Sequence, residues 1–411
     1  MNFNTALLHQ SFDGEKSTGS TLAPIFQSSA FAHESAEKLE AVFNNKAPGF
    51  AYTRISNPTV DSFEKRIAAL EKGIGAVACS SGMAAVTMSL LNILESGDEL
   101  IAGSALFGGT IDLFCDLEAF GIKTVFADEV TAESVERLAT DRTKAVFTEL
   151  IGNPKLNVTD IKAVSEAAHK RGIPLIIDST TATPYLINPF DFGADIVIHS
   201  SSKYINGSGN SISGVIIDSG SFKWDPKRYR GFEEYKKFGK FAYLAKLRNG
   251  IWRNAGACLA PMNAYLNSIG LETLGLRMER LCFNAKKLAE FFEADGRVTV
   301  NYPALESNPY HRLTERELKG MGGAIITIRA GSKEKAFKLI NSLKYACIAT
   351  NIGDVRTLVI HPASTIYTHS TIEQQVNAGV YEDTIRISVG IEDIDDLIAD
   401  FRQAIDKTEV I

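Results

Sequence analysis

Between about residues 58 and 200, short apolar segments alternate with amphipathic helical segments, a pattern that few folds can accommodate. The apolar segments include GAVACSS, DELIAGS, KAVFTEL, PLIIDST and ADIVIHS. Short, nearly continuous apolar segments separated by helices are typical of parallel strands that are buried on both faces. We therefore predict an α/β fold with a mostly parallel central sheet.

The pattern changes on both sides of this region. The first part of the chain is mixed in character and favours an extended arm. Beyond about residue 245 the chain favours long helices, interrupted near Pro261, followed by the strand-like runs RVTVNYP, GAIITIRA and DTIRISVGI. We expect an N-terminal arm at 1–55, a large domain at 56–250 and a smaller α+β domain at 251–411.

Charge and cysteine usage argue against several classes of protein. Lys plus Arg number 43 against 49 Asp plus Glu, and the net charge of −6 argues against a dedicated nucleic-acid binder. Five widely spaced cysteines without a CxxC pair favour a reducing compartment over a disulfide scaffold or a zinc site. Neither a secretory signal nor an apolar stretch of the ~20 residues that a membrane span needs is visible. We expect a cytoplasmic protein with no nucleic-acid or membrane partner.

Two further features are interpreted as structural. The histidines at 199, 361 and 369 are separated and lack carboxylates at ligand spacing, so we expect no metal site there. The Lys-rich stretch at 223–240 also contains acids and aromatic residues. We expect it to form a solvated loop near the mouth of the active site.

Polar residues follow three of the predicted strands, where open parallel sheets bind their ligands. The turn Ser80-Ser81-Gly82-Met83 enters a helix, and its N–H groups suit an anionic phosphate. Asp178 ends a buried strand and needs a partner. Lys203 closely follows another apolar strand, where desolvation lowers a lysine's pKa and favours Schiff-base chemistry. Taken singly, each has a structural alternative: an ordinary turn, a cap, or a lysine reaching out to solvent.

Together, a phosphate turn, a buried carboxylate and a strand-end lysine are what pyridoxal 5′-phosphate (PLP) requires. An aromatic side chain is then needed against the cofactor ring, and Phe107 follows the DELIAGS segment. Neither GxGxxG nor GxxxxGK[ST] occurs, so nicotinamide dinucleotides and nucleoside triphosphates lack their usual signature.

The chain resembles the Cys/Met-metabolism PLP-dependent enzymes, which have the aspartate-aminotransferase fold (fold type I). The resemblance runs through nearly the whole chain. It rests on YTRISNPT, SSGMAA, LFGGT, IDSTTATPYL, GADIVIHSSSKYINGSGNSISG, VIHPAS and IRISVGIED, in that order. It implies PLP as cofactor and a homotetramer built as a dimer of dimers, in which the N-terminal arm contributes to the neighbouring subunit.

The resemblance also implies roles for individual residues. Lys203 carries PLP, Asp178 binds the pyridine nitrogen, and Asn153 contacts the 3′-oxygen. Arg386 grips the substrate carboxylate, a task suited to its bidentate fork. The phosphate is held by residues of this chain and by two from the neighbouring subunit. They are Gly82, Met83, Ser200 and Ser202, with Tyr52 and Arg54 from the neighbour.

Within the family, the loop that starts at Asn351 is similar to the O-acetylhomoserine sulfhydrylase form, whereas lyases and cystathionine synthases more often have Ser at that position. This branch implies a γ-replacement in which O-acetyl-L-homoserine and sulfide (or methanethiol) give homocysteine (or methionine) and acetate. A methionine γ-lyase or a cystathionine γ-synthase or γ-lyase is the nearest alternative. Lyases of that type often have Cys where Gly109 stands, which disfavours them. A PLP-binding regulator without turnover is less well supported.

The chain departs from the family pattern at several positions. Phe107 stands where most members have Tyr, so ring stacking is kept while the hydroxyl is absent. We therefore expect Lys203 or Tyr52 to carry out the proton transfers. We assign catalytic roles to Lys203, Tyr52 and Phe107. Asn351 and Tyr52 join Arg386 as expected substrate contacts. Ser179 and Ser202 replace the usual Asn and Thr and keep polar chemistry.

Overall fold

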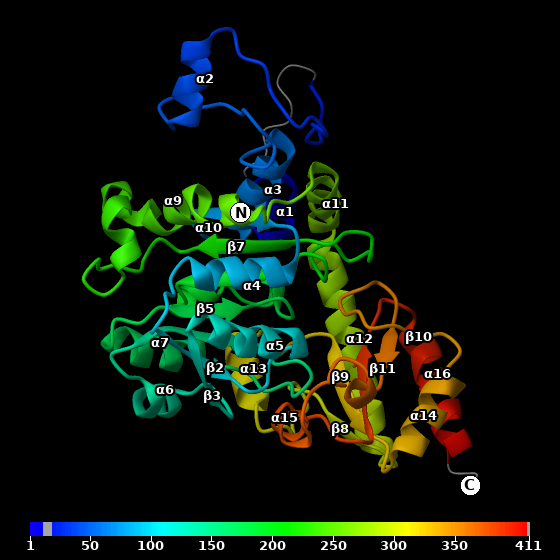
Figure 1. Cartoon of the computed structure of the whole chain (residues 1–411). Helices are drawn as coiled ribbons and strands as arrows, with labels where there is room; N and C mark the ends of the chain where they lie inside the picture. Colours follow the sequence, from blue (N-terminus) through cyan, green and yellow to red (C-terminus); the bar gives the residue numbers. More distant parts are fainter. Residues whose placement is uncertain (11–18, 409–411) are drawn as a thin grey trace.

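The computed structural model describes residues 1–10 and 19–408, which contain two β-sheets (Figure 1). Residues 11–18 of the predicted arm and 409–411 at the end of the predicted third part lie outside the described residues. The larger sheet has the strand order β1-β7-β6-β5-β4-β2-β3 and the smaller one β10-β11-β12-β9-β8. The strands of the larger sheet are β1 (Gly75–Cys79), β2 (Glu99–Gly103), β3 (Lys123–Ala127), β4 (Thr143–Glu149), β5 (Leu175–Asp178), β6 (Ile196–His199) and β7 (Gly214–Asp218). Those of the smaller sheet are β8 (Thr299–Asn301), β9 (Ile325–Arg329), β10 (Cys347–Ile348), β11 (Leu358–Ile360) and β12 (Thr384–Ser388).

Most strands of the larger sheet are parallel to their neighbours, which confirms the predicted fold class. Strands β2 to β6 pair in parallel, and only β7 runs antiparallel, between β1 and β6. Along β4, Val146 belongs to the core on one face, whereas Ala145 and Phe147 belong to the core on the other. Both faces are therefore covered, which explains the continuous apolar runs. The sequence pattern did not predict β7, which follows a Gly- and Ser-rich stretch.

Helices cover the larger sheet on both faces. One core packs against α1 (Phe3–His9), α3 (Pro58–Leu70), α6 (Ala132–Leu138), α7 (Ile161–Lys170) and α11 (Pro261–Glu272). The other packs against α4 (Gly82–Leu91), α5 (Gly108–Asp116), α9 (Ala242–Asn249) and α10 (Ile251–Ala255). Helix α3 begins as its sequence predicts. The Asn57 side chain accepts a hydrogen bond from the Thr59 N–H, and Pro58 occupies the first turn.

The smaller sheet packs against α14 (Lys333–Ser342) and α16 (Ile394–Thr408) and against the second half of α12 (Leu274–Asp295). Helix α12 buries Met278 and Leu281 in a core of the larger sheet, and Leu288 and Phe292 in the core of the smaller one. This helix therefore joins the two sheets. The division at 1–55, 56–250 and 251–411 stays a prediction.

The remaining helical segments are short. They are α2 (Ala36–Phe43), α8 (Thr183–Leu186), α13 (His311–Glu317) and α15 (Ile372–Asn377), with 3₁₀ turns η1 (Leu117–Phe120), η2 (Pro189–Phe192), η3 (Arg230–Phe241) and η4 (Pro362–Ser364). Helix α2 has no buried residue and stands away from both sheets (Figure 1). In the part of the chain that the structure describes, no helix combines the length and the apolar character needed to cross a membrane.

The segment at 223–240 differs from the solvated loop expected at the mouth of the active site. Trp224 stacks on Phe232 with 4.4 Å between ring centroids, and both Tyr229 and Phe232 are buried. The Tyr229 hydroxyl donates to the carbonyl of Lys144, near the amino end of β4. The segment therefore packs against the amino ends of the strands, because its aromatic residues outweigh its charges.

Candidate active site

A pocket lies at the carboxyl ends of β4, β5 and β6, at the edge where parallel sheets bind their ligands. It is lined by eight residues to which the sequence assigned a role. They are Gly82, Met83, Phe107, Asn153, Asp178, Ser200, Lys203 and Arg386. The structure thus brings together residues from both sheets, because Arg386 lies on β12 while the others belong to the larger-sheet region.

The Lys203 ammonium lies within this pocket and is largely buried. Its Nζ donates to Oδ1 of Asn351 at 2.6 Å. Burial, and secondarily the Arg386 charge, lower the pKa of Lys203 to about 8. A larger fraction of this amine is therefore neutral near neutral pH than for an ordinary lysine, as a nucleophile or a base requires.

Asp178 is the last residue of β5 and supplies the pocket with a carboxylate. Its Oδ1 accepts a hydrogen bond from the Thr180 N–H at 2.9 Å. Among the described residues it forms no ion pair, and burial raises its pKa. A buried carboxylate without a cation suits a ligand that brings a protonated ring nitrogen.

The first turn of α4 forms the phosphate end of the pocket. The Ser81 side chain caps the helix by accepting from the Ala84 N–H. A Cβ added at Gly82 would lie 2.6 Å from the Ser200 Cβ, so only glycine lets these two turns approach. The amino end of the helix is thus held beside the Ser200 hydroxyl, an arrangement that suits a phosphate.

The Phe107 ring borders the pocket and depends on a glycine two residues later. A Cβ added at Gly109 would lie 2.8 Å from the Phe107 Cε1. Any larger residue at Gly109 would therefore displace the ring. This contact gives a structural reason for the glycine in the LFGGT motif.

Glu149, the last residue of β4, is a pocket residue that the sequence analysis missed. Its Oε1 accepts from the Phe107 N–H at 2.6 Å, and its Oε2 accepts from the Asn153 N–H at 3.0 Å. Burial, with a further contribution from Asp178, raises its pKa well above the usual range. The signal that identified Asp178, an acid that ends a buried strand, also applies to Glu149.

Arg386 is buried and has an unfilled donor. Its Nη1 donates to Oδ1 of Asn153 at 3.3 Å and its Nη2 to the carbonyl of Asn351 at 3.1 Å. Its buried Nε has no partner, and among the described residues Arg386 forms no ion pair. Burial lowers its pKa to about 10. A buried cation with an open donor edge is suited to binding a carboxylate.

Four of the predicted residues do not line this pocket. They are Ser202, Tyr52, Arg54 and Asn351, of which Asn351 contacts Lys203 beside it. The Ser202 hydroxyl donates to the Ser213 carbonyl and accepts from the Ser213 N–H, so it is used inside the fold. Tyr52 is 41% exposed, and the Arg54 guanidinium lies 5.5 Å from its ring centroid. Arg54 also donates to the carbonyl of Arg253 at 2.6 Å. Their expected roles stay predictions.

The pocket residues fit PLP. Gly82 and Ser200 form the phosphate end, Asp178 is the unpaired carboxylate, and Phe107 offers a ring face. Lys203 is the amine with a lowered pKa that would hold the cofactor. The unfilled Nε of Arg386 is suited to a carboxylate group.

The chain is similar to known proteins along nearly its whole length. The family model described as Cys/Met metabolism PLP-dependent enzyme matches residues 4–406. Homocysteine synthase of Schizosaccharomyces pombe is 41% identical over 98% of both chains. O-acetyl-L-homoserine sulfhydrylase of Leptospira meyeri is 39% identical over 98% of this chain and 96% of its own.

A solved structure shares the whole fold. It is a putative O-acetylhomoserine (thiol)-lyase of Campylobacter jejuni, with a TM-score of 0.92, 34% identity, and coverage of 99% of this chain and 100% of its own. That structure contains N′-pyridoxyl-lysine-5′-monophosphate.

Proposed function

Because this chain belongs to the family of Cys/Met-metabolism PLP-dependent enzymes, we propose that it converts O-acetyl-L-homoserine and sulfide into homocysteine and acetate in methionine biosynthesis. The observation that carries this proposal is the position of Asn351. Its side-chain oxygen accepts from Lys203, and its carbonyl accepts from Arg386. Asn351 thus contacts both Lys203, an amine that can transfer protons, and Arg386, a cation that can bind a carboxylate. An α-amino acid substrate needs both groups.

Each pocket residue then has a chemical task. Bound PLP supplies an electron sink that stabilises the negative charge left when a proton is removed beside the amino group. Lys203 is the amine that would hold PLP, and its Nζ would take up and return protons during the reaction. Arg386 fixes the substrate carboxylate, and Asp178 keeps the cofactor nitrogen protonated. Glu149 holds the backbone of Phe107 and Asn153 in place through the two N–H groups it accepts.

Replacement by a thiol is favoured over γ-elimination by two observations. The relatives cited above are a homocysteine synthase and an O-acetyl-L-homoserine sulfhydrylase. In addition, the Phe107 ring occupies the space that a side chain at Gly109 would need, and lyases of the family often have Cys there. Methanethiol in place of sulfide would give methionine by the same steps. A methionine γ-lyase or a cystathionine γ-synthase or γ-lyase is the second candidate.

We also propose that the protein is a cytoplasmic homotetramer built from two dimers. Tyr52 and Arg54 do not line the pocket of their own chain, and the α2 region next to them in sequence stands away from both sheets (Figure 1). In this proposal Tyr52 and Arg54 reach the cofactor pocket of the neighbouring subunit. Mixing inactive Lys203→Ala with inactive Arg54→Gln chains would then restore part of the activity, whereas independent subunits would restore none.

The function is tested by a substrate-switch assay on purified, PLP-loaded protein. O-acetyl-L-homoserine is supplied with and without sulfide, with methanethiol, and beside a parallel sample containing methionine alone. We expect homocysteine only when both substrates are present, and little 2-oxobutanoate. Lys203→Ala should abolish the reaction, while exposed Lys344→Ala should leave it unchanged. Rapid 2-oxobutanoate formation from methionine alone would assign the protein to the lyases.

A further inference from the structure

A second cavity, of about 270 Å³, opens at the amino ends of β2 and β4, the opposite edge of the larger sheet from Lys203. Asp98 directly precedes β2, and Lys144 is the second residue of β4. The seven residues of β4 span about 20 Å between this cavity and the cofactor pocket. Four basic residues line the cavity, which we call the basic pocket. They are Lys144, Lys227, Arg228 and Arg230.

These four cations lack the ion pairs that neighbouring cations form. Within the described ranges 1–10 and 19–408, none of the four has a carboxylate oxygen within 4.0 Å. By contrast, Arg142, two residues before Lys144, pairs with Glu99 at 2.6 Å. The basic pocket therefore gathers positive charge that the chain itself leaves unpaired.

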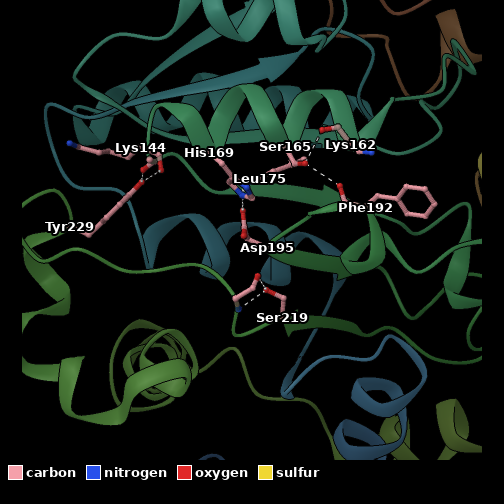
Figure 2. Close-up of polar contacts among 11 residues, drawn as sticks. Lys144, Lys162, Ser165, His169, Leu175, Phe192, Asp195, Ser219 and Tyr229 are labelled. Carbon is pink, nitrogen blue, oxygen red and sulfur yellow. Dashed lines mark hydrogen bonds and ion pairs between the residues drawn. The ribbon is translucent and has the colours of Figure 1, made fainter.

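The arrangement is fixed to the sheet. Nη2 of Arg228 donates to the carbonyl of Thr143 at 2.5 Å, while its buried Nε has no partner. The Tyr229 hydroxyl donates to the carbonyls of Lys144, at 3.2 Å, and of Gly172, at 2.9 Å; Figure 2 shows Tyr229 reaching Lys144. Arg228 is thus held against the amino end of β4, and the Lys144 Nζ donates to the carbonyl of Asp141 at 3.3 Å.

Two carboxylates share the basic pocket but do not neutralise it. The Asp98 Oδ2 accepts from the N–H of Glu95 at 2.8 Å, so Asp98 closes a turn of the loop before β2. With four cations against Asp98 and Glu95, the lining keeps an excess of positive charge. Burial, and then the nearby Arg228 and Arg230, lower the pKa of Lys144, while Asp98 and Asp141 act in the opposite direction.

We propose that the basic pocket binds a small phosphate-bearing anion, either free phosphate or an organic phosphate ester. A phosphate offers three strong acceptor oxygens and up to two negative charges. The open edge of the Arg228 guanidinium matches a pair of these oxygens, and the lysine ammonium groups supply further point charges. The site is separate from the cofactor phosphate site beside Gly82 and does not depend on the proposed reaction.

The test is isothermal titration calorimetry on the PLP-loaded protein, in which the cofactor's own phosphate fills the site beside Gly82. The probes are inorganic phosphate, glycerol 3-phosphate and succinate. We expect one phosphate probe per chain to bind, with an affinity that falls as sodium chloride is raised. Tighter binding of the ester would identify an organic phosphate, and equal binding would identify free phosphate.

Matched variants locate the site. Exposed or half-buried cations of the basic pocket are neutralised in one triple variant, and the same charge is removed from exposed positions outside the basic pocket in a control. The pocket variant carries Lys144→Gln, Lys227→Gln and Arg230→Gln; the control carries Lys333→Gln, Lys344→Gln and Arg312→Gln. We expect the pocket variant to weaken phosphate binding about tenfold or more, equivalent to about 1.4 kcal/mol. The control should bind within about twofold of the parent, since a general loss of charge has a small effect.

Three results would overturn the proposal. The first is the absence of phosphate binding to the parent protein, and the second is an equal loss of affinity in the pocket and control variants. The third is binding of succinate without binding of either phosphate probe, since this would indicate a dicarboxylate site. Thermal melting curves of both triple variants establish that they are folded before they are titrated.

Discussion

Two buried arginines, Arg277 on α12 and Arg386 on β12, differ in how their donors are used. Burial lowers the pKa of both to about 10. All three nitrogens of Arg277 donate, to the Thr273 hydroxyl and to the carbonyls of Tyr204, Ile205 and Gly270. Among the described residues, Arg386 makes only two hydrogen bonds, at 3.3 and 3.1 Å, and leaves its Nε without a partner.

This difference indicates that Arg277 stabilises the fold, whereas Arg386 is available to bind a ligand. A buried cation costs free energy, and Arg277 offsets that cost through backbone carbonyls that it fixes next to Lys203 in the sequence. Arg386 offsets less of it and keeps a donor edge for a ligand. The predictions below test whether Arg277 acts through stability and Arg386 through substrate.

The largest effect is expected for Arg386→Gln. Glutamine removes the charge that we propose binds the substrate carboxylate, so we expect kcat/KM for O-acetyl-L-homoserine to fall about a hundredfold or more. The free energy of unfolding should change little, because an uncompensated buried charge is also removed. Steady-state kinetics and urea unfolding measure the two quantities. Unchanged kinetics in the folded variant would contradict the assignment of this arginine.

Arg277→Gln should have the opposite profile. The carbonyls of Tyr204 and Gly270 would lose their donors, and we expect the free energy of unfolding to fall by about 3 kcal/mol. The folded fraction should keep most of its kcat/KM. Urea unfolding beside Arg402→Gln, an exposed arginine, provides the comparison. If the variant kept full stability but lost activity, Arg277 would act on the substrate, as proposed for Arg386, and not on stability.

Glu149→Gln is expected to have an intermediate effect. The amide nitrogen of glutamine cannot accept from the N–H of Phe107 or Asn153, so one of these backbone groups loses its partner. We expect kcat to fall about tenfold, which corresponds to about 1.4 kcal/mol. The control is Glu118→Gln, an exposed carboxylate, which should be silent. Equal activities for the two variants would show that Glu149 does not contribute to catalysis.

The smallest effect is a shift in a pH profile. In its proposed role Lys203 attaches PLP through its neutral form. Because its pKa is lowered to about 8, the loading rate of cofactor-free protein should rise as pH increases through about 8. Because the Arg386 charge lowers this pKa, Arg386→Gln should move the midpoint upward. Arg277→Gln should leave it in place. The visible absorbance of bound cofactor follows loading in stopped flow, and a downward shift would contradict the electrostatic coupling.

The sequence predicted the parts of the site that follow a strand. Lys203 and Asp178, which the structure places in one pocket, were predicted because Asp178 ends one apolar run and Lys203 closely follows another, where charged residues are unusual. Glu149 carries the same signal and was missed because β4 is followed by two more apolar residues, Leu150 and Ile151. The mostly parallel sheet was predicted, but β7, β10 and β11 were not, being short or next to glycine-rich segments.

The sequence pattern could not predict contacts between segments that are far apart in the chain. Lys203 and Asn351 are 148 residues apart, and their hydrogen bond depends on how the two sheets pack. The loop at Asn351 was assigned only by resemblance. The segment at 223–240 was expected to be a solvated loop near the mouth of the active site. Most of its residues are exposed, but the expected location was wrong, because its aromatic cluster packs at the amino ends of the strands.

Helix α12 has a consequence for how the molecule melts. Its 22 residues extend about 33 Å, with one half in a core of the larger sheet and the other in the core of the smaller. If either core unfolds, half of α12 loses its packing, and an unpacked helical segment of that length is unstable in water. The unfolding of one core therefore destabilises the other. The two sheets should therefore unfold in one cooperative calorimetric transition, and partial proteolysis should yield no stable half.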